Sequence, residues 1–295
     1  MPLLDEEFVA KIKGLELVSR KIIAGQRKGE RRSKRRGQST EFADYRPYVA
    51  GDDLRFLDWN IYGRLDRLFL KLFEEEEDLW LHILIDRSRS MRFGEPDKFL
   101  YARRVAAALG TIALQGTDRV RVASFAGGLR PVIGPASGRR QIPRLLDALE
   151  RLETDDEGTT DLARSCREFA MARRPSGIVV FLSDFFDRCG FEGALRYLLS
   201  GGSRSEIYLL HVLASEETDP PLSGDLKLLD CEDGLDADVS MSPALLGAYR
   251  RKLEAFRGEI RDFAARRGMH YAFAPTAVPF DLLILDHLRR RGLLR

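Results

Sequence analysis

The sequence predicts an α/β protein built on a doubly wound, mostly parallel sheet. Three runs of apolar residues, at 79–85, 178–182 and 206–213, are nearly uninterrupted, as in strands that helices cover on both faces. Segments with the periodicity of amphipathic helices separate these runs. Strands that alternate with helices in this way indicate a Rossmann-type sheet with helices on both sides.

The N-terminal quarter of the chain differs in composition from the rest. Residues 5–24 carry apolar side chains at helical spacing, and seven of the ten residues at 27–36 are Lys or Arg. The next segment, 41–67, is rich in aromatic residues and in Arg and Asp, and 68–73 alternates as a strand does. We therefore expect an N-terminal helical and β appendage over 1–75.

The remaining residues, 76–295, are expected to form the α/β domain. Pro96 and Asp97 begin its first long helix, because proline is favoured in the first helical turn. Ser242 caps its longest helix, which ends at Gly268. The expected order is strand 79–85, helix from 97, strands 118–126 and 129–133, helices 139–151 and 161–173, strand 177–184, helix 190–200, strand 206–213, a hairpin at 226–230 and 237–240, helix 243–267, strand 270–274 and helix 279–291.

Composition and charge limit the classes of function. With 44% hydrophobic and 32% charged residues among 295, the chain has the composition of a globular protein with a core. Its formal net charge of +2 indicates no general attraction to nucleic acids or membranes. The N-terminus lacks the apolar segment of a secretion signal, no apolar run reaches the roughly 18 residues of a membrane span, and the three cysteines lack zinc spacing. We therefore expect a cytoplasmic protein.

Polar residues follow two of the predicted strands at the edge where parallel strands end. Asp86 ends the run ILID, Ser88 and Ser90 come after it, and Asp184 ends the run VFLSD. Thr160 lies in a third loop, DDEGTTDLA. Ligands of open α/β sheets bind beyond the carboxyl ends of the strands, so these side chains can meet there. An all-oxygen set with two carboxylates suits Mg²⁺ or Mn²⁺ rather than zinc.

Two other interpretations of this pattern are open. Asp and Ser also close turns by local hydrogen bonds, so Asp86, Ser88 and Ser90 could form a turn without a ligand. A serine nucleophile needs a base, but the four histidines lie within predicted strands or helices. The chain has no GxSxG, P-loop or HExxH motif, and the second aspartate of a phosphoaspartyl site is replaced by Ser88. We therefore expect no enzymatic activity.

The basic run at 27–36 provides an alternative function. Its Lys and Arg side chains could bind RNA or DNA phosphates, which gives affinity without sequence readout. The run contains no interleaved aromatic residues on which bases would stack. A solvated linker is the favoured interpretation, and a nucleic-acid-associated protein is the alternative.

The residues after the predicted strands resemble a known metal site. DRSRSM, GTTDL and FLSD are similar, in content and order, to the metal-ion-dependent adhesion site (MIDAS) of von Willebrand factor A domains. The resemblance implies that Ser88, Ser90 and Thr160 contact the metal and that Asp86 and Asp184 act directly or through water. It also implies that a carboxylate of a partner protein completes the coordination of the metal.

The preceding segment sharpens this resemblance. GQSTEFADYRPYVAGDDLRFLDWN is similar to the signature of a bacterial family called domain of unknown function fifty-eight, in which a von Willebrand A-like domain follows. Members of that family are typically encoded beside MoxR-type AAA+ ATPases. The resemblance implies a protein-interaction module that works with a MoxR-type AAA+ ATPase in chaperone-like assembly or maturation of another protein complex.

The sequence departs from the metal-site pattern at two places. The residues between the motif positions are usually small, but here they are Arg87 and Arg89. The glycine that often follows the aspartate of the third loop is also missing after Asp184. A cation near the site opposes a bound metal but attracts acidic groups of a partner. We therefore expect an acidic partner surface to face Arg87 and Arg89.

Overall fold

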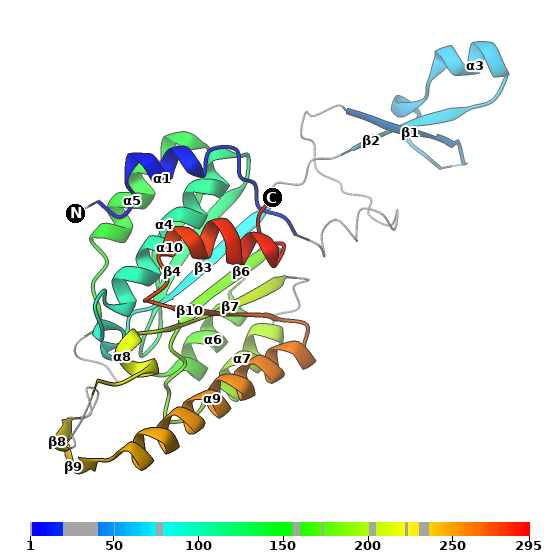
Figure 1. Ribbon diagram of the computed structural model, residues 1–295. Coiled ribbons are helices and arrows are strands. Elements are labelled where there is room, and N and C mark those ends of the chain that lie inside the picture. Colours follow the sequence, from blue (N-terminus) through cyan, green and yellow to red (C-terminus); the bar gives the residue numbers. More distant parts are fainter. Residues whose placement is uncertain are drawn as a thin grey trace. The chain divides into compact units, whose positions relative to one another are not determined.

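The computed structural model consists of two compact units (Figure 1). The larger unit contains residues 1–28 and 79–295, and the smaller one contains residues 29–78. The basic run at 27–36 lies outside the described part of the chain. The described residues are 2–19, 41–49, 51–74, 79–155, 160–172, 174–200, 205–221, 224–229 and 236–295.

A six-stranded sheet forms the centre of the larger unit. Its strand order is β10-β7-β6-β3-β4-β5, and every neighbouring pair is parallel except β4 with β5. The three uninterrupted apolar runs form the central strands β3, β6 and β7, so the doubly wound α/β fold expected from the sequence is confirmed. The strands are β3 (Trp80–Asp86), β4 (Arg119–Phe125), β5 (Leu129–Ser137), β6 (Ile178–Ser183), β7 (Glu206–Leu213) and β10 (His270–Pro275).

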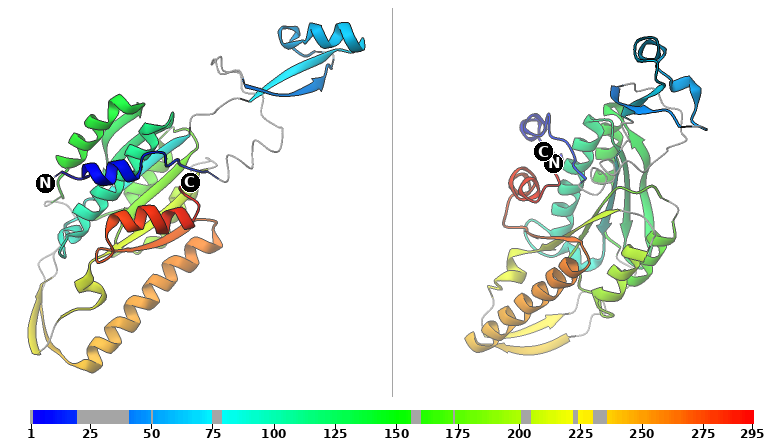
Figure 2. Two further views of the ribbon diagram at one scale, coloured as in Figure 1. Left: turned by 45° about the horizontal axis from the view of Figure 1, so that its top comes forward. Right: turned by 90° about the vertical axis from the view of Figure 1, so that its right-hand side faces the viewer.

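Helices cover one face of the sheet (Figure 2). They bury alternate residues of its central strands. They are α4 (Lys98–Gln115), α5 (Ile142–Glu150) and a C-terminal segment. That segment consists of α10 (Phe280–Leu282) and a π-helical part, η4 (Leu283–Leu288). The residues of β3 in this core are Leu81, Ile83 and Ile85.

The opposite face packs against α6 (Leu162–Met171), α7 (Phe191–Ser200) and α9 (Pro243–Arg266). Between β7 and α9, an antiparallel hairpin is formed by β8 (Gly224–Leu229) and β9 (Asp236–Met241), as the sequence predicted. Among the described residues, no helix combines the length and the apolar character that crossing a membrane requires.

The expected helix over 5–24 is wrong beyond its first turns. The helix α1 contains only Glu6–Lys11. Gly14 has a φ of 95°, which residues with a side chain rarely adopt, and it turns the chain out of the helical path. Leu17 then pairs with Leu294 in an isolated β-bridge. The last residues of the expected helix lie outside the described part of the chain.

This N-terminal segment belongs to the α/β unit, which corrects the expected division into 1–75 and 76–295. Phe8 is 3% exposed and Ile12 is fully buried, and both join the core around α4 and β3. The backbones of Glu16 and Arg295 are also hydrogen-bonded to each other. The apolar side of α1 is buried in the helical layer on the sheet, so this segment is part of the core of the α/β unit.

Glu206, at the start of β7, binds the N-terminal segment to the sheet. Its buried carboxylate accepts hydrogen bonds from Ser19 Oγ at 3.1 Å, Tyr208 OH at 2.9 Å and His270 Nε2 at 3.0 Å. Burial alone would raise the pKa of Glu206, but these three donors lower it to about 2. One carboxylate therefore connects the N-terminal segment with two strands.

The smaller unit is an antiparallel hairpin with two short helical segments. Strand β1 (Glu41–Pro47) pairs with β2 (Phe69–Glu74), close to the strand expected at 68–73. Between them lie η1 (Leu54–Phe56) and α3 (Trp59–Leu65).

Asp58 organises this unit from the position before α3. It is 4% exposed, and its carboxylate accepts hydrogen bonds from Asn60 N, Ile61 N and Tyr45 OH. Lys71 of β2 lies 3.0 Å from the same carboxylate. Asp58 therefore caps the helix and connects it with both strands.

Truncating Ile12 tests whether α1 is part of the cooperative core. Ile12→Ala should lower the free energy of unfolding by about 2–5 kcal/mol, because it removes buried methyl groups and leaves a cavity. The exposed neighbour Lys13 provides the control, and Lys13→Ala should change the free energy by less than about 0.5 kcal/mol. Chemical denaturation at neutral pH measures both. Equal stabilities of the two variants would place α1 outside the cooperative unit.

The low pKa of Glu206 predicts a pH dependence of stability. Its contribution is fully present above the ordinary value of 4.5 and is lost as the pH falls toward about 2. Glu206→Gln removes the charge, so it should lower the free energy of unfolding by about 1–3 kcal/mol at neutral pH. The free energy of unfolding of this variant should also fall less than that of the wild type as the pH is lowered. Urea unfolding at a series of pH values measures this, with Glu192→Gln on the exposed side of α7 as the control. Superimposable pH profiles of wild type and Glu206→Gln would contradict the prediction.

Candidate functional site

The site lies where the strand order of the sheet reverses. Strand β4 pairs with one side of β3, whereas β6 comes back to pair with its other side. Asp86 is the last residue of β3, and Asp184 directly follows β6. Crevices at such switch points are frequent ligand sites in open α/β sheets. The fold therefore brings both expected carboxylates to one crevice.

Asp86 is 1% exposed and is held by two hydrogen bonds. Its Oδ1 accepts from Ser88 N at 2.9 Å, and its Oδ2 accepts from Ser183 Oγ at 2.5 Å. Burial and the neighbouring carboxylate of Asp184 raise the pKa of Asp86 to about 7. A negative charge on Asp86 is therefore unfavourable beside that of Asp184, and a cation in the crevice would reduce the repulsion between the two carboxylates.

A hydrogen-bonded path through Ser88 and Ser90 connects the two carboxylates, and it begins at the backbone N–H of Ser88, which donates to Asp86. Ser88 Oγ and Ser90 Oγ are 3.0 Å apart, and Ser90 Oγ donates to Asp184 Oδ2 at 2.8 Å. The other carboxylate oxygen, Asp184 Oδ1, accepts from Phe186 N at 3.1 Å. Ser88 is buried, but Ser90 is only half-buried, so this line of oxygens extends toward the surface.

The separations of these oxygens are those of ordinary hydrogen bonds, and they are also compatible with neighbouring ligands of a hard divalent cation. Neighbouring ligands of an octahedral Mg²⁺ with bonds of about 2.0–2.1 Å lie about 2.9 Å apart. The Ser88–Ser90 and Ser90–Asp184 oxygen pairs, at 3.0 and 2.8 Å, match that spacing. Among the described residues, three or more His, Cys, Asp or Glu side chains gather in a metal-binding arrangement neither at this crevice nor elsewhere.

Thr160, the fifth expected ligand, lies two residues before the first residue of α6 and is half-buried. Asp161 caps that helix by accepting a hydrogen bond from Arg164 N at 2.7 Å. The backbone N–H of Asp161 donates to Ala126 O, which places this loop beside the end of β4. Contact of Thr160 with a metal stays a prediction.

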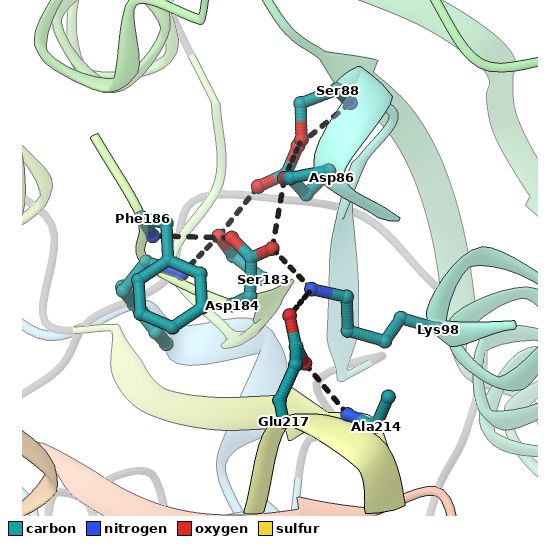
Figure 3. A network of polar contacts seen from close by, with 10 residues as sticks. Asp86, Ser88, Lys98, Ser183, Asp184, Phe186, Ala214 and Glu217 are labelled. Carbon is teal, nitrogen blue, oxygen red and sulfur yellow. Dashed lines mark hydrogen bonds and ion pairs between the residues drawn. The ribbon is translucent and has the colours of Figure 1, made fainter. Parts of the chain in front are cut away.

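Lys98 and Glu217 complete the site, and the sequence analysis missed both. Lys98 is fully buried, and its Nζ lies 2.7 Å from Asp184 Oδ2 and 2.6 Å from Glu217 Oε1 (Figure 3). Glu217 is in the short helix α8 (Ser215–Thr218), and its Oε2 accepts from Ala214 N at 2.8 Å. Burial alone would lower the pKa of Lys98, but the two carboxylates raise it, so the ammonium stays charged.

The sequence contained a signal for Lys98. A lysine in line with an apolar helical face requires a buried anion, since charged groups are almost never fully buried without a partner. A cation in the first helical turn is also disfavoured by the helix dipole. Glu217 carries no such signal, because a glutamate in a short polar segment is usually exposed. The apolar positions that continue the face of Lys98 are Ala102, Val105, Leu109 and Ile112.

Arg87 is buried in an ion pair with Asp155, which corrects the expectation that it attracts an acidic partner surface together with Arg89. Its Nη2 lies 2.5 Å from Asp155 Oδ2, and the residue is 9% exposed. The backbone N–H of Asp155 donates to Arg87 O at 2.7 Å, so Arg87 binds the loop that leads toward α6. Arg89 is exposed in the 3-10 segment η2 (Arg89–Arg92).

Phe185 occupies the place where a glycine often follows the third-loop aspartate. Its φ of 59° lies in the left-handed region, which costs a residue with a side chain about 1–2 kcal/mol. The ring is 1% exposed, stacks on Phe181 at a centroid distance of 5.7 Å and meets the edge of His211 at 5.4 Å. This packing offsets the backbone cost, so the turn forms without the glycine.

The sequence of this chain is similar to those of known proteins. Residues 44–258 match the profile of a family described as "Protein of unknown function DUF58". Uncharacterized proteins of Mycobacterium tuberculosis and Mycobacterium bovis are each 25% identical to this chain over 259 residues, which is 87% of this chain and 81% of theirs.

The fold of this chain is distantly similar to those of solved structures. A conserved hypothetical protein, BatB from Bacteroides thetaiotaomicron, is 15% identical with a TM-score of 0.44, over 72% of this chain and 98% of that one. A von Willebrand factor type A protein from Catenulispora acidiphila is 15% identical with a TM-score of 0.46, over 76% of this chain and 43% of that one. These values describe distant similarity.

The substitution Asp86→Asn distinguishes a metal site from a turn that binds no ligand. Because burial and Asp184 disfavour the charged form of Asp86, Asp86→Asn should melt at or above the wild type in a chelator. If the dissociation constant is about 0.1–1 mM, about 1 mM Mg²⁺ should raise the Tm of the wild type by about 1–5 °C and leave that of Asp86→Asn unchanged. Thermal unfolding followed by circular dichroism measures both.

Ser88→Ala is the matched variant for this measurement. It should lose the response to Mg²⁺ without the gain in chelator, because it removes an oxygen ligand but no charge. A strongly destabilised Asp86→Asn in chelator would instead show that Asp86 is a structural acceptor for Ser88 N and Ser183 Oγ.

Proposed function

The chain belongs to the family described as protein of unknown function DUF58, and from that premise we propose that it is a non-enzymatic protein-interaction module with a MIDAS-like site. The observation that carries the proposal is the line of oxygens from Ser88 through Ser90 to Asp184 at the switch point of the sheet. Because Ser90 is half-buried, this line reaches the surface where a partner can approach.

Five residues would hold a Mg²⁺ or Mn²⁺ ion at this site. The hydroxyls of Ser88, Ser90 and Thr160 and the carboxylates of Asp86 and Asp184 are hard oxygen donors of the kind these ions prefer. When bound, the ion supplies a concentrated positive charge that a carboxylate of a partner protein can reach. The contribution of the chain is to hold the oxygens in place by hydrogen bonds from backbone and hydroxyl groups.

Exposed side chains near the motif would form the rest of the docking face. Arg89 is exposed, and the rings of Phe93 and Phe186 are 51% and 37% exposed. Phe93 follows the serine motif in sequence, and Phe186 follows Asp184 by two residues. Aromatic residues and arginine are enriched in protein interfaces, and the charge of Arg89 favours an acidic partner surface.

The partner that we propose is a MoxR-type AAA+ ATPase in the cytoplasm. The complex would act in chaperone-like assembly or maturation of another protein complex. This part of the proposal is supported by the resemblance of residues 37–60 to a family signature whose members are typically encoded beside such ATPases. An acidic surface of the ATPase would then meet Arg89 and the ion.

Binding to the MoxR-type ATPase of the same organism tests this proposal. The double variant Ser88→Ala with Ser90→Ala should weaken the complex by about tenfold or more, because two ligands of the bridging ion are lost. Arg89→Glu should slow association by about threefold to tenfold at low ionic strength and less at high ionic strength. Surface plasmon resonance at constant Mg²⁺ concentration measures affinity and association rate.

The matched control is Arg266→Glu. Arg266 is exposed at the end of α9, just before β10 begins, so it lies at the opposite edge of the sheet from the site. Its reversal changes the net charge equally and should leave binding unchanged. Unchanged affinity of the serine double variant would exclude the motif from the interface, and a wild type that forms no complex would refute the proposed partner.

A further inference from the structure

The ammonium group of Lys98 lies inside the candidate ion site (Figure 3). Its side chain is 0% exposed, and Nζ contacts Asp184 Oδ2 at 2.7 Å and Glu217 Oε1 at 2.6 Å. The same atom lies 5.5 Å from the ring centroid of Phe186. Asp184 and Phe186 belong to the loop after β6, and Glu217 follows β7. A fixed cation therefore connects α4 with two neighbouring loops at the carboxyl edge of the sheet.

The carboxylates of the site explain this unusual lysine. Asp86 and Asp184 are each 1% exposed, and Glu217 adds a third carboxylate whose side chain is 14% exposed. Carboxylates that are withdrawn from water repel one another unless a counter-ion lies between them. Lys98 supplies that counter-ion although both its burial and its place in the first turn of α4 disfavour a positive charge. Its ion pairs with Asp184 and Glu217 outweigh these costs.

One oxygen atom connects Lys98 to the metal site. Asp184 Oδ2 accepts hydrogen bonds from both Ser90 Oγ, at 2.8 Å, and Lys98 Nζ, at 2.7 Å. This oxygen is also the last in the line of oxygen ligands that would bind a divalent ion. An ion on that line and the ammonium of Lys98 therefore share a carboxylate oxygen, and two cations so close together repel.

We propose that Lys98 is the resident cation of this site. Its ammonium keeps Asp184 and Glu217 together without a metal, and it weakens the binding of a divalent ion to the same oxygens. The inference rests on the proposed function only for the identity of those oxygens. The docking face consequently keeps its shape when divalent ions are scarce. The ion pair of Lys98 and Glu217 sets the affinity of the site for a divalent ion.

Removing the ammonium gives the direct test. Lys98→Met keeps an apolar side chain of similar length, so the α4 face stays filled. In a chelator its Tm should fall below that of the wild type, because Asp184 and Glu217 lose their counter-ion. Isothermal titration calorimetry on the full chain should show Mn²⁺ binding to Lys98→Met at least about tenfold more tightly than to the wild type. Mn²⁺ should also raise the Tm of Lys98→Met more than that of the wild type.

A second variant tests the opposite direction and stays available if Lys98→Met does not fold. Glu217→Gln removes a carboxylate and leaves the charge of Lys98 less compensated, so it should bind Mn²⁺ more weakly than the wild type. Glu206→Gln is the matched control, because it removes a buried carboxylate at the start of β7, at the opposite edge of the sheet. It should lower the Tm without changing the affinity for Mn²⁺.

The outcomes separate this inference from the proposed function. The inference is overturned if Lys98→Met binds Mn²⁺ no more tightly than the wild type, including the case in which neither binds it. Tighter binding by Glu217→Gln than by the wild type would overturn it as well. The proposed metal site fails in a different way, with identical Mn²⁺ isotherms for the wild type and the Ser88→Ala with Ser90→Ala variant. Lys98→Met would then still have a lower Tm than the wild type in a chelator.

Discussion

Two carboxylates, those of Asp86 and Asp184, are buried in one crevice of the sheet, and the surrounding structure is organised around their charge. Charges withdrawn from water are unfavourable unless hydrogen-bond donors or counter-ions surround them. Asp86 receives a backbone N–H and a hydroxyl, and Asp184 receives a backbone N–H, a hydroxyl and the ammonium of Lys98. The turn after β3, the left-handed turn at Phe185 and the buried lysine of α4 all serve this requirement.

The topology of the sheet creates the requirement. Strands β3 and β6 are neighbours although they are distant in the chain, as the bond between Ser183 and Asp86 across 97 positions shows. Because both strands are parallel and central, their last residues lie at the same edge and beneath helices on both faces. Two strand-end aspartates in such positions are brought together by the fold, whatever they bind.

The same electrostatic balance connects the structure with the function proposed for it. A partner or an ion that approaches from outside meets a crevice whose negative charge is only partly compensated from inside. Lys98 supplies the internal part and is out of reach of solvent, whereas Ser90, Arg89 and the rings of Phe93 and Phe186 remain accessible. The face can thus offer oxygens, a positive charge and apolar surface together, which is the mixture typical of protein interfaces.

The sequence by itself determined the architecture and four of the residues in the crevice. Uninterrupted apolar runs specify strands that are covered on both faces, and parallel strands end at a common edge, so the strand pattern alone places Asp86, Ser88, Ser90 and Asp184 together. The tertiary structure decided which charges meet. It paired Arg87 with Asp155, 68 positions away, and Lys98 with Asp184 and Glu217, 86 and 119 positions away. It also took the N-terminal segment into the α/β unit, where Leu17 meets Leu294. Contacts of this kind join residues that are distant in the chain, and they leave no periodic pattern from which local spacing could reveal them.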